Sequence, residues 1–317
     1  MRIELPMYGI FRRVRKTSLV IILCAAVLAT CSRQDASPPP KPKPTPGKTL
    51  RIGLIPEQNI FKQLERYQPL AGYLSRKIGA KIELKVLPRY GNIIDNFQSE
   101  KLDGAFFGSF TYALAHAKLG VSVVARPLGM DNTSTYYGMI FVRRDSGIRT
   151  IKDMKGKRFA FVDKATTAGY LLPLEFFYEG GVKDYKTYFK ETYFTGTHQN
   201  TIYDVLNKRA DAGAAKNTMY YRLAKENPRI GRELGILTRS PDVPENGLAL
   251  SRDLDDSLKK QFKEVLLGMH DDPMGKEILQ QFGAIRFIET TEENYRAVYE
   301  YARHIGLDLS TYDYIND

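Results

Sequence analysis

Residues 50–87 read LRIGLIPEQNIFKQLERYQPLAGYLSRKIGAKIELKVL, and this stretch decides the class of fold. Its first residues, Leu50–Pro56, read as a buried strand that ends at a loop. Apolar side chains then recur at helical spacing through residues 60–78, and Gly79 is a typical helix stop. Residues 81–87 alternate between polar and apolar, which predicts a second strand. A strand, a helix and a strand in this order favour an α/β domain with a largely parallel sheet.

The same alternation continues along the chain. Strands are predicted at residues 104–107, 121–125, 138–143, 158–162, 210–214 and 247–251. Helices are predicted around residues 93–97, at 112–119, 167–178 and 198–208, and finally as a pair at 254–270 and 291–304. Two successive cycles of strands and helices, with a late strand that returns the chain to its first part, indicate an α/β protein.

The first thirty residues predict export rather than a folded element. Residues 12–16, RRVRK, are basic, and residues 18–29 are apolar but too short for a comfortable transmembrane helix. The apolar run ends in Leu28-Ala29-Thr30-Cys31, which resembles a bacterial lipobox, whose cysteine becomes the lipidated first residue after cleavage. We therefore expect residues 1–30 to be a lipoprotein signal peptide and Cys31 to carry the lipid. An uncleaved anchor and an ordinary secretion signal are the alternatives, and all three place the body outside the cytoplasm.

A proline-rich linker, residues 31–48, follows the signal segment. Residues 32–48 hold six prolines and no large apolar side chain, so they cannot build a core and prefer an extended form. We expect this linker to hold a body that begins near Thr49 off a membrane. Of the net charge of +11, residues 1–30 carry +4 and residues 31–48 carry +3. The modest remainder disfavours nucleic-acid binding and suits either small anions or a solvated surface.

The residues that a metal centre or an enzyme needs are not arranged for those roles. The two cysteines, Cys24 and Cys31, allow no disulfide framework in the body, and the four histidines do not pair at metal-ligand spacing. The sequence contains no GxSxG, P-loop or HExxH motif and no GxGxxG before a helix. We therefore expect no catalytic residue, no metal and no cofactor.

The segment most informative about function is FVDKATTAGY, residues 161–170. A strand here runs into a loop with two hydroxyl residues and two small ones, and a helix follows. Such a turn aims free backbone amides and hydroxyls at one point, and the helix start adds roughly half a positive charge there. The point therefore suits an oxyanion. Simple capping of the helix by threonine is the alternative interpretation.

A second segment, GTHQNT at residues 196–201, opens the next predicted helix after a glycine. His198 could offer a ring N–H to an oxyanion beside this second helix start. A purely structural histidine is the alternative interpretation.

These segments carry a resemblance to the phosphate, phosphite and phosphonate periplasmic binding proteins, the PhnD-like family of ABC-transporter substrate-binding proteins. Residues 163–173, DKATTAGYLLP, are similar to the family signature D-P-x-S-T-S-G-[YF]-L-x-P, and residues 196–198 to its G-x-H. Residues 87–90 and 134–138 match segments with ligand-contacting tyrosines. The motifs occur in the right order at compatible spacing, and the resemblance covers nearly all of residues 49–310.

The resemblance implies the two-lobed α/β fold of type II periplasmic binding proteins. Each lobe would be a mostly parallel sheet flanked by helices, with the ligand cleft between the lobes. Lobe 1 would comprise residues 49–138 and 245–317, and lobe 2 residues 139–244. Hinge crossovers would fall near Tyr137-Gly138 and Pro244-Glu245.

The resemblance also implies a site for a small phosphorus oxyanion, held by hydroxyl, amide and imidazole donors from both lobes. The expected ligand-binding residues are Tyr90, Tyr136, Thr166, Thr167, Ala168 and His198. For the two tyrosines, ordinary aromatic packing is the alternative.

The sequence departs from the family pattern at positions that bear on the ligand. Lys164 stands where the family usually has proline, and Thr166 where it has serine. Members that bind an aminoalkyl phosphonate hold its ammonium with two carboxylates, and the matching positions here are Met219 and Asn246. Because a buried ammonium without a carboxylate is costly, we expect poor binding of 2-aminoethylphosphonate. Lys216 could add positive charge near the cleft or could be solvated surface.

Together these observations predict a solute-binding lipoprotein of an ABC importer that captures a phosphonate, phosphite or phosphate. The expected location is the periplasm or cell envelope, with a lipid anchor in the membrane. The expected partners are the small oxyanion and the transporter permease, with the protein itself a monomer. A membrane-anchored sensor lipoprotein built on the same fold, or a binding protein for another anion, are the alternatives.

Overall fold

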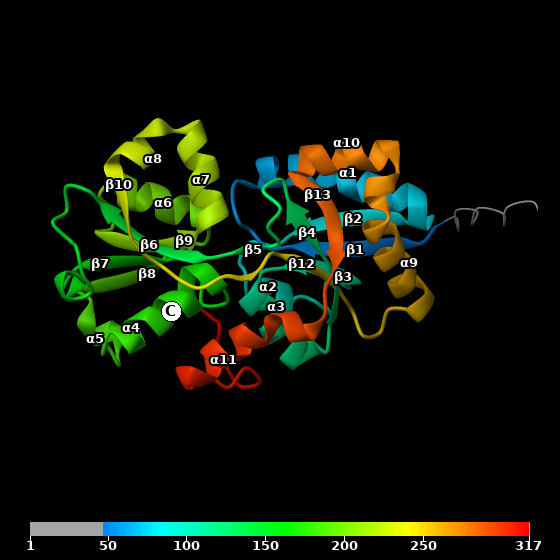
Figure 1. Ribbon diagram of the computed structural model, residues 1–317. Coiled ribbons are helices and arrows are strands. Elements are labelled where there is room, and N and C mark those ends of the chain that lie inside the picture. The colour runs from blue at the N-terminus through cyan, green and yellow to red at the C-terminus, as the bar shows by residue number, and fades with distance from the viewer. Residues whose placement is uncertain (1–46, 317) are drawn as a thin grey trace, which may run out of the picture. The chain divides into compact units, whose positions relative to one another are not determined.

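The computed structural model describes residues 47–316. The predicted signal peptide, Cys31 and nearly all of the linker therefore lie outside the described residues. Within residues 47–316, two large sheets and a short two-stranded ribbon are surrounded by helices (Figure 1). None of the helices within residues 47–316 combines the length and the hydropathy of a membrane span.

The first sheet has six strands in the order β13-β4-β12-β3-β1-β2. Their bounds are Thr49–Leu54 (β1), Lys81–Val86 (β2), Gly104–Phe107 (β3), Ser122–Gly129 (β4), Gly247–Leu250 (β12) and Ala284–Glu289 (β13). β1 pairs in parallel with β2 and β3, whereas β12 runs antiparallel to both β3 and β4, and β13 antiparallel to β4. Four of the six strands therefore point the same way, and the two late strands are the reversed ones.

The second sheet has five strands in the order β10-β6-β9-β7-β8. Their bounds are Gly138–Arg143 (β6), Arg158–Phe161 (β7), Glu191–Phe194 (β8), Ala212–Lys216 (β9) and Leu234–Arg239 (β10). β7 pairs in parallel with β8 and β9, and β6 runs antiparallel to β9 and β10. Only β6 points against the other four strands. In each sheet most strands therefore point the same way, and the antiparallel pairs are made by β12 and β13 in the first sheet and by β6 in the second.

Alternate side chains of the buried strands point to opposite faces of each sheet. Both faces are therefore apolar, and helices cover both. In the first sheet, Leu50, Ile52 and Leu54 of β1 pack with one set of helices, and Ala105 and Phe107 of β3 pack with the other. The first set is α1 (Ile60–Ile78), α9 (Asp256–Leu267) and α10 (Pro273–Phe282); the second is α2 (Asn92–Asp95), α3 (Ser109–Leu119) and α11 (Arg296–His304).

The second sheet is enclosed in the same way. Met139 and Phe141 of β6 face one cluster of helices, while Ile140 and Val142 face the other. The first cluster contains α6 (His198–Leu206), α7 (Asn217–Glu226) and α8 (Pro228–Glu233); the second contains α4 (Leu172–Glu179) and α5 (Tyr185–Tyr188). The predicted α/β class with sheets flanked by helices is confirmed.

The chain passes between the two sheets twice through one short ribbon. β5 (Thr135–Tyr136) follows β4 of the first sheet and precedes β6 of the second. β11 (Val243–Pro244) follows β10 of the second sheet and precedes β12 of the first. The two strands pair antiparallel, Val243 opposite Tyr136 and Pro244 opposite Thr135. The two passages therefore lie side by side (Figure 1).

Several predicted elements have the observed bounds, and others need correction. The helix at 60–78 and the strands at 104–107 and 138–143 are confirmed. The predicted helix at 167–178 instead starts with a π-helical turn, Thr167–Leu171, before α4. The predicted helix through Phe97 is only the single turn α2, which ends at Asp95.

The prediction of only two helices after residue 250 is wrong, because α10 and β13 lie between α9 and α11. The sequence contains local signals for α10. Asp272 caps it by accepting from the Met274 amide, Pro273 occupies its first position, and Gly283 ends it at φ +85°. Helices α7 and α8 and strands β8 and β10 were likewise not predicted.

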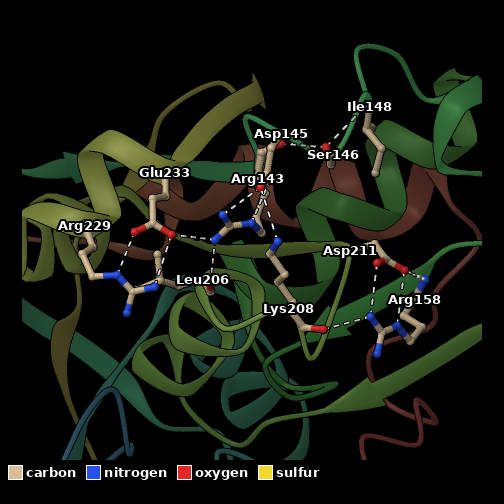
Figure 2. A network of polar contacts seen from close by, with 10 residues as sticks. All are labelled: Arg143, Asp145, Ser146, Ile148, Arg158, Leu206, Lys208, Asp211, Arg229 and Glu233. Atoms are coloured by element: carbon tan, nitrogen blue, oxygen red, sulfur yellow. Dashed lines mark hydrogen bonds and ion pairs between the residues drawn. The ribbon is translucent and has the colours of Figure 1, made fainter.

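A network of charged side chains ties the loops of the second sheet together at the end of β6 (Figure 2). Arg143, the last residue of β6, donates to Glu233 Oε2 (2.8 Å), to the Leu206 carbonyl (2.7 Å) and to both oxygens of Asp145. Glu233 also accepts a hydrogen bond from Arg229 Nε (2.7 Å). Nearby, Asp211 pairs with the Arg158 guanidinium and accepts from the Arg158 amide at the start of β7. Since Val142 pairs with Ala212 and Gly138 with Lys216, this network lies at the opposite end of the sheet from Lys216.

Candidate functional site

Polar side chains from both sheets meet at one small cavity. From the first sheet come Glu57 after β1, Tyr90 after β2, Thr111 on α3 and Asn246 just before β12. From the second sheet come residues 166–168 after β7, His198 after β8 and Lys216 at the end of β9; Tyr136 of the ribbon completes the lining. Most of these residues follow the carboxyl ends of parallel strands, where α/β sheets place their ligand sites.

The structure brings all six residues predicted for ligand binding to this cavity: Tyr90, Tyr136, Thr166, Thr167, Ala168 and His198. Each of them is buried. The cavity volume is about 10 Å³, which is room for about one water molecule. This is far below the roughly 300–1,000 Å³ of pockets for drug-sized ligands, so even a small oxyanion requires the surrounding groups to move apart.

The turn of residues 163–169 is held rigidly by its own polar groups. Asp163 accepts from the Ala165 amide (2.9 Å) and, through its carbonyl, from both the amide and the hydroxyl of Thr166 (3.0 and 2.7 Å). Gly169 is required for the close approach of the turn to β7, because a Cβ there would lie 2.4 Å from Val162 Cβ. The hydroxyl of Thr166 is therefore engaged in shaping the turn.

The helical segment that follows the turn presents amide groups to the cavity. The first amides of a helix have no intrahelical partner, and in this chain they are those of Thr167, Ala168 and Gly169. Thr167 and Ala168 line the cavity. Aligned peptide dipoles add partial positive charge at the same end, so the cavity wall favours an anion.

Thr167 also joins the turn to the first sheet. Its Oγ1 accepts from the Phe110 amide of α3 at 2.8 Å, and the Thr111 hydroxyl of α3 donates to the Ala165 carbonyl at 2.7 Å. Since the Thr167 oxygen is an acceptor in the first bond, its own hydrogen remains for the Tyr136 hydroxyl or for a ligand. Two buried hydrogen bonds thus span the two sheets beside the cavity.

His198 is placed by a glycine turn and a helix cap. Gly196 adopts φ +80°, and the Thr197 side chain caps α6 by accepting from the Asn200 amide at 3.0 Å. The ring Nδ1 accepts from the backbone amide of Lys216 at 3.3 Å. Burial lowers the pKa of His198 to about 4, so the ring is neutral at pH 7 and carries its hydrogen on Nε2. His198 is therefore a neutral donor toward the cavity.

The two predicted tyrosines occupy different places in the wall. The Tyr90 hydroxyl is buried and has no hydrogen-bond partner within residues 47–316, and its ring meets the His198 ring edge-on at 6.0 Å. An unsatisfied buried hydroxyl is costly, so a ligand acceptor at this position would remove a penalty. Tyr136 lies under Lys216, whose Nζ is 4.3 Å from the ring centre.

Sequence reasoning missed two acidic residues that pair with Lys216: Glu57 in the wall of the cavity and Glu245 next to it. Lys216 is buried, and its Nζ donates to Glu57 (3.2 Å), to Asn246 (3.1 Å) and to Glu245. Burial alone would raise the Glu57 pKa, but the surrounding basic groups, Lys216 foremost, together outweigh burial and lower the pKa to about 2. Burial alone would lower the pKa of Lys216. The nearby carboxylates of Glu245 and Glu57 have a larger opposite effect, so the Lys216 pKa lies above its ordinary value. Glu57 and Lys216 are therefore both charged at pH 7.

The two positions matched to carboxylates of the family differ in role. Asn246 lines the cavity, whereas Met219 is buried in the core between α6, α7 and β6 and does not line it. Lys216 lies in the wall, so the alternative that it is solvated surface is wrong.

The chain is similar to proteins of one family. The description "ABC transporter, phosphonate, periplasmic substrate-binding protein" belongs to the family model that matches residues 52–295. The probable ABC transporter phosphite binding protein PhnD1 of Prochlorococcus marinus is 25% identical over 270 residues, which cover 82% of this chain and 90% of that protein. The phosphonates-binding periplasmic protein of Escherichia coli is 24% identical over 241 residues, covering 74% of this chain and 70% of that protein.

Solved structures show the same fold. PhnD1 from Prochlorococcus marinus, solved in complex with methylphosphonate, superimposes with a TM-score of 0.73 at 25% identity, covering 81% of this chain and 98% of that chain. A binding protein component of an ABC phosphonate transporter from Pseudomonas aeruginosa gives a TM-score of 0.76 at 21% identity, covering 81% and 86%.

The two sheets, the paired passages between them and the shared polar cavity define a type II periplasmic binding protein. Because the family model spans most of the chain, this chain belongs to the periplasmic substrate-binding proteins of ABC phosphonate transporters, and family membership places it in the periplasm.

Proposed function

We propose that this chain captures a small phosphorus oxyanion, a phosphonate, phosphite or phosphate, for an ABC importer, and that the ligand occupies the cavity between the two sheets. The observation that carries the proposal is the donor set around this cavity: the Ala168 amide, the Thr167 hydroxyl, neutral His198 and the unsatisfied hydroxyl of Tyr90. Charge-assisted hydrogen bonds from such donors to an oxyanion are strong and directional. The names of the relatives support a phosphorus oxyanion over other anions.

We further propose that the two sheets are the cores of two lobes that close on the ligand. Lobe 1 would comprise residues 49–138 and 245–317, and lobe 2 residues 139–244. The paired strands β5 and β11 would form the hinge, because each passage between the sheets is only a few residues long. The bonds from α3 to Thr167 and Ala165 would then form only in the closed state.

The sequence motif at residues 28–31 supports attachment to the membrane through a lipid on Cys31, with residues 32–48 as a spacer. Incorporation of labelled palmitate, lost in Cys31→Ser, would establish this anchor. Unchanged membrane association of Cys31→Ser would contradict it.

Calorimetric titration of the stripped protein tests the binding proposal. We expect micromolar or tighter binding of at least one of phosphate, phosphite and methylphosphonate, with 2-aminoethylphosphonate bound poorly. Binding of none of these ligands would refute the proposed function.

A further inference from the structure

The ammonium of Lys216 has a complete set of acceptors. It donates to Glu57 Oε1, Glu245 Oε1 and Asn246 Oδ1. An ammonium has three N–H donors, and within residues 47–316 all three are used. Lys216 therefore has no hydrogen left for a ligand, and its charge is opposed by two carboxylates. This arrangement does not support the expectation that Lys216 adds positive charge to the cleft.

The groups around this ammonium form a recognition site for a primary amine. Two carboxylates and an amide oxygen surround it, and the face of Tyr136 lies 4.3 Å away, within cation–π range. Glu57, Glu245 and Asn246 all belong to segments next to strands of the first sheet, whereas Lys216 ends β9 of the second. The second sheet thus supplies the cation and the first sheet supplies its acceptors.

This amine site and the anion site share one cavity. Glu57, Lys216 and Asn246 line it together with Thr167 and His198. A ligand that combined an oxyanion with an ammonium would place its cation beside two of the same acceptors, the Glu57 carboxylate and the Asn246 amide oxygen. There it would meet the ammonium of Lys216, which is attached to the chain and competes at the high effective concentration of a tethered group.

We propose that Lys216 is a built-in occupant of an ammonium site and that it determines the ligand class of the cavity. With Lys216 in place, the cavity admits phosphorus oxyanions that lack a cationic group and excludes aminoalkyl phosphonates. This inference rests on the proposed function, and it gives the expected weak binding of 2-aminoethylphosphonate a different cause: the carboxylates are present but already occupied.

Asn246 also favours an anionic ligand over a cationic one. Because its Oδ1 accepts from Lys216, the amide NH₂ is the group left to face other partners in the cavity. Asn246 therefore offers donors, which suit an oxyanion and repel an ammonium. Lys216 thus acts in two ways. Its ammonium fills the cation site, and its hydrogen bond to Oδ1 fixes the orientation of the Asn246 amide.

The variant Lys216→Ala tests the proposal. It empties the ammonium site and leaves the carboxylates unpaired, so we expect its affinity for methylphosphonate to fall at least tenfold. Its affinity for 2-aminoethylphosphonate should rise, so that the ratio of the two affinities changes at least 100-fold in favour of the amine. Ethylammonium at millimolar concentration should restore methylphosphonate binding by refilling the site, an effect that a general loss of structure would not give. Lys276→Ala, an exposed lysine on α10, is the matched control and should behave as the wild type.

The wild-type protein provides a test that does not depend on the folding of a variant. We expect it to bind methylphosphonate, phosphite or phosphate at least 100-fold more tightly than 2-aminoethylphosphonate. Equal or tighter binding of the amine by the wild type, or parallel changes of both affinities in Lys216→Ala, would overturn this inference and leave the proposed function intact. Binding of no phosphorus oxyanion by the wild type would instead refute the proposed function.

Discussion

At the scale of single residues, the cavity combines neutral donors with a neutralised cation. His198 and Tyr90 are uncharged at pH 7, since burial lowers the pKa of the imidazole and raises that of the phenol. Lys216 is charged but paired with two carboxylates. An oxyanion would therefore be held by hydrogen bonds and helix dipoles rather than by an unpaired positive side chain.

Thr167 has two roles that substitution can separate. Thr167→Ala removes a hydroxyl that faces the cavity and leaves the buried Phe110 amide unpaired. We expect roughly 10- to 100-fold weaker ligand binding and, in the ligand-saturated protein, whose lobes are closed, a loss of about 1–3 kcal/mol of unfolding free energy. Thr167→Ser keeps the hydroxyl and should retain most of both. Thr187→Ala, at an exposed position on α5, is the control, measured by calorimetric titration and thermal unfolding. Unchanged ligand affinity in Thr167→Ala would mean that the Thr167 hydroxyl does not contribute to ligand binding.

His198 should make stability depend on pH. Its folded-state pKa of about 4 lies below its ordinary value of 6.5, so the unfolded chain binds more protons between these values. Unfolding free energy should therefore fall, by on the order of a few kcal/mol, as the pH drops from 6.5 to 4. His198→Asn, which can still accept from the Lys216 amide, should show a shallower slope in denaturant titrations across this range. An unchanged slope would mean that His198 is not buried as described.

The site residues differ in how well the sequence predicts them. Thr166, Thr167, Ala168 and His198 lie in continuous motifs at helix starts, where the local pattern alone indicates anion chemistry. Glu57 and Glu245 belong to no such motif, and their role depends on a long-range contact with Lys216. The sequence places Lys216 near the cleft but does not reveal that three acceptors saturate it. Charge pairing between distant segments is a property of the folded chain.

At the scale of secondary-structure elements, the turn between β7 and α4 is the most constrained part of the site. A Cβ at Gly169 would lie 2.4 Å from Val162 Cβ and 2.8 Å from Thr166 Oγ1. Gly169→Ala should therefore push the turn away from β7, lower unfolding free energy by about 1–3 kcal/mol and weaken ligand binding. Gly231→Ala on α8, where no atom lies within 4 Å of the new Cβ, should be neutral or slightly stabilising in chemical denaturation. Wild-type stability and affinity in Gly169→Ala would contradict the tight packing of the turn.

Elements with strong local patterns were predicted, and elements without them were not. Helix α1 has a regular apolar stripe and a left-handed glycine at its end, and its predicted bounds are confirmed. Strand β10 alternates little in burial and lies at an edge of its sheet. Its pairing with β6, rather than its own sequence, makes it a strand. The π-helical turn at Thr167–Leu171 depends on how the turn packs against β7, which helical periodicity does not show.

At the scale of the whole molecule, the proposed function requires the two lobes to move. The hydrogen bonds of Phe110 to Thr167 and of Thr111 to Ala165 connect the sheets beside the cavity and would break on opening. A ligand favours closure only by its higher affinity for the closed state. We expect the radius of gyration from small-angle scattering to decrease when methylphosphonate is added to the stripped protein, and to change little in Thr167→Ala. An identical radius with and without bound ligand would contradict hinge closure.

The proposed function places a small phosphorus oxyanion in the cavity shared by the two sheets. A crystal structure of the protein grown with methylphosphonate would show whether it lies there. We expect a tetrahedral ligand whose oxygens meet the Ala168 amide, the Thr167 hydroxyl and His198 Nε2, with the Tyr90 hydroxyl donating from the other side. A ligand bound at a different place, with this cavity closed and the Tyr90 hydroxyl still unpaired, would contradict it.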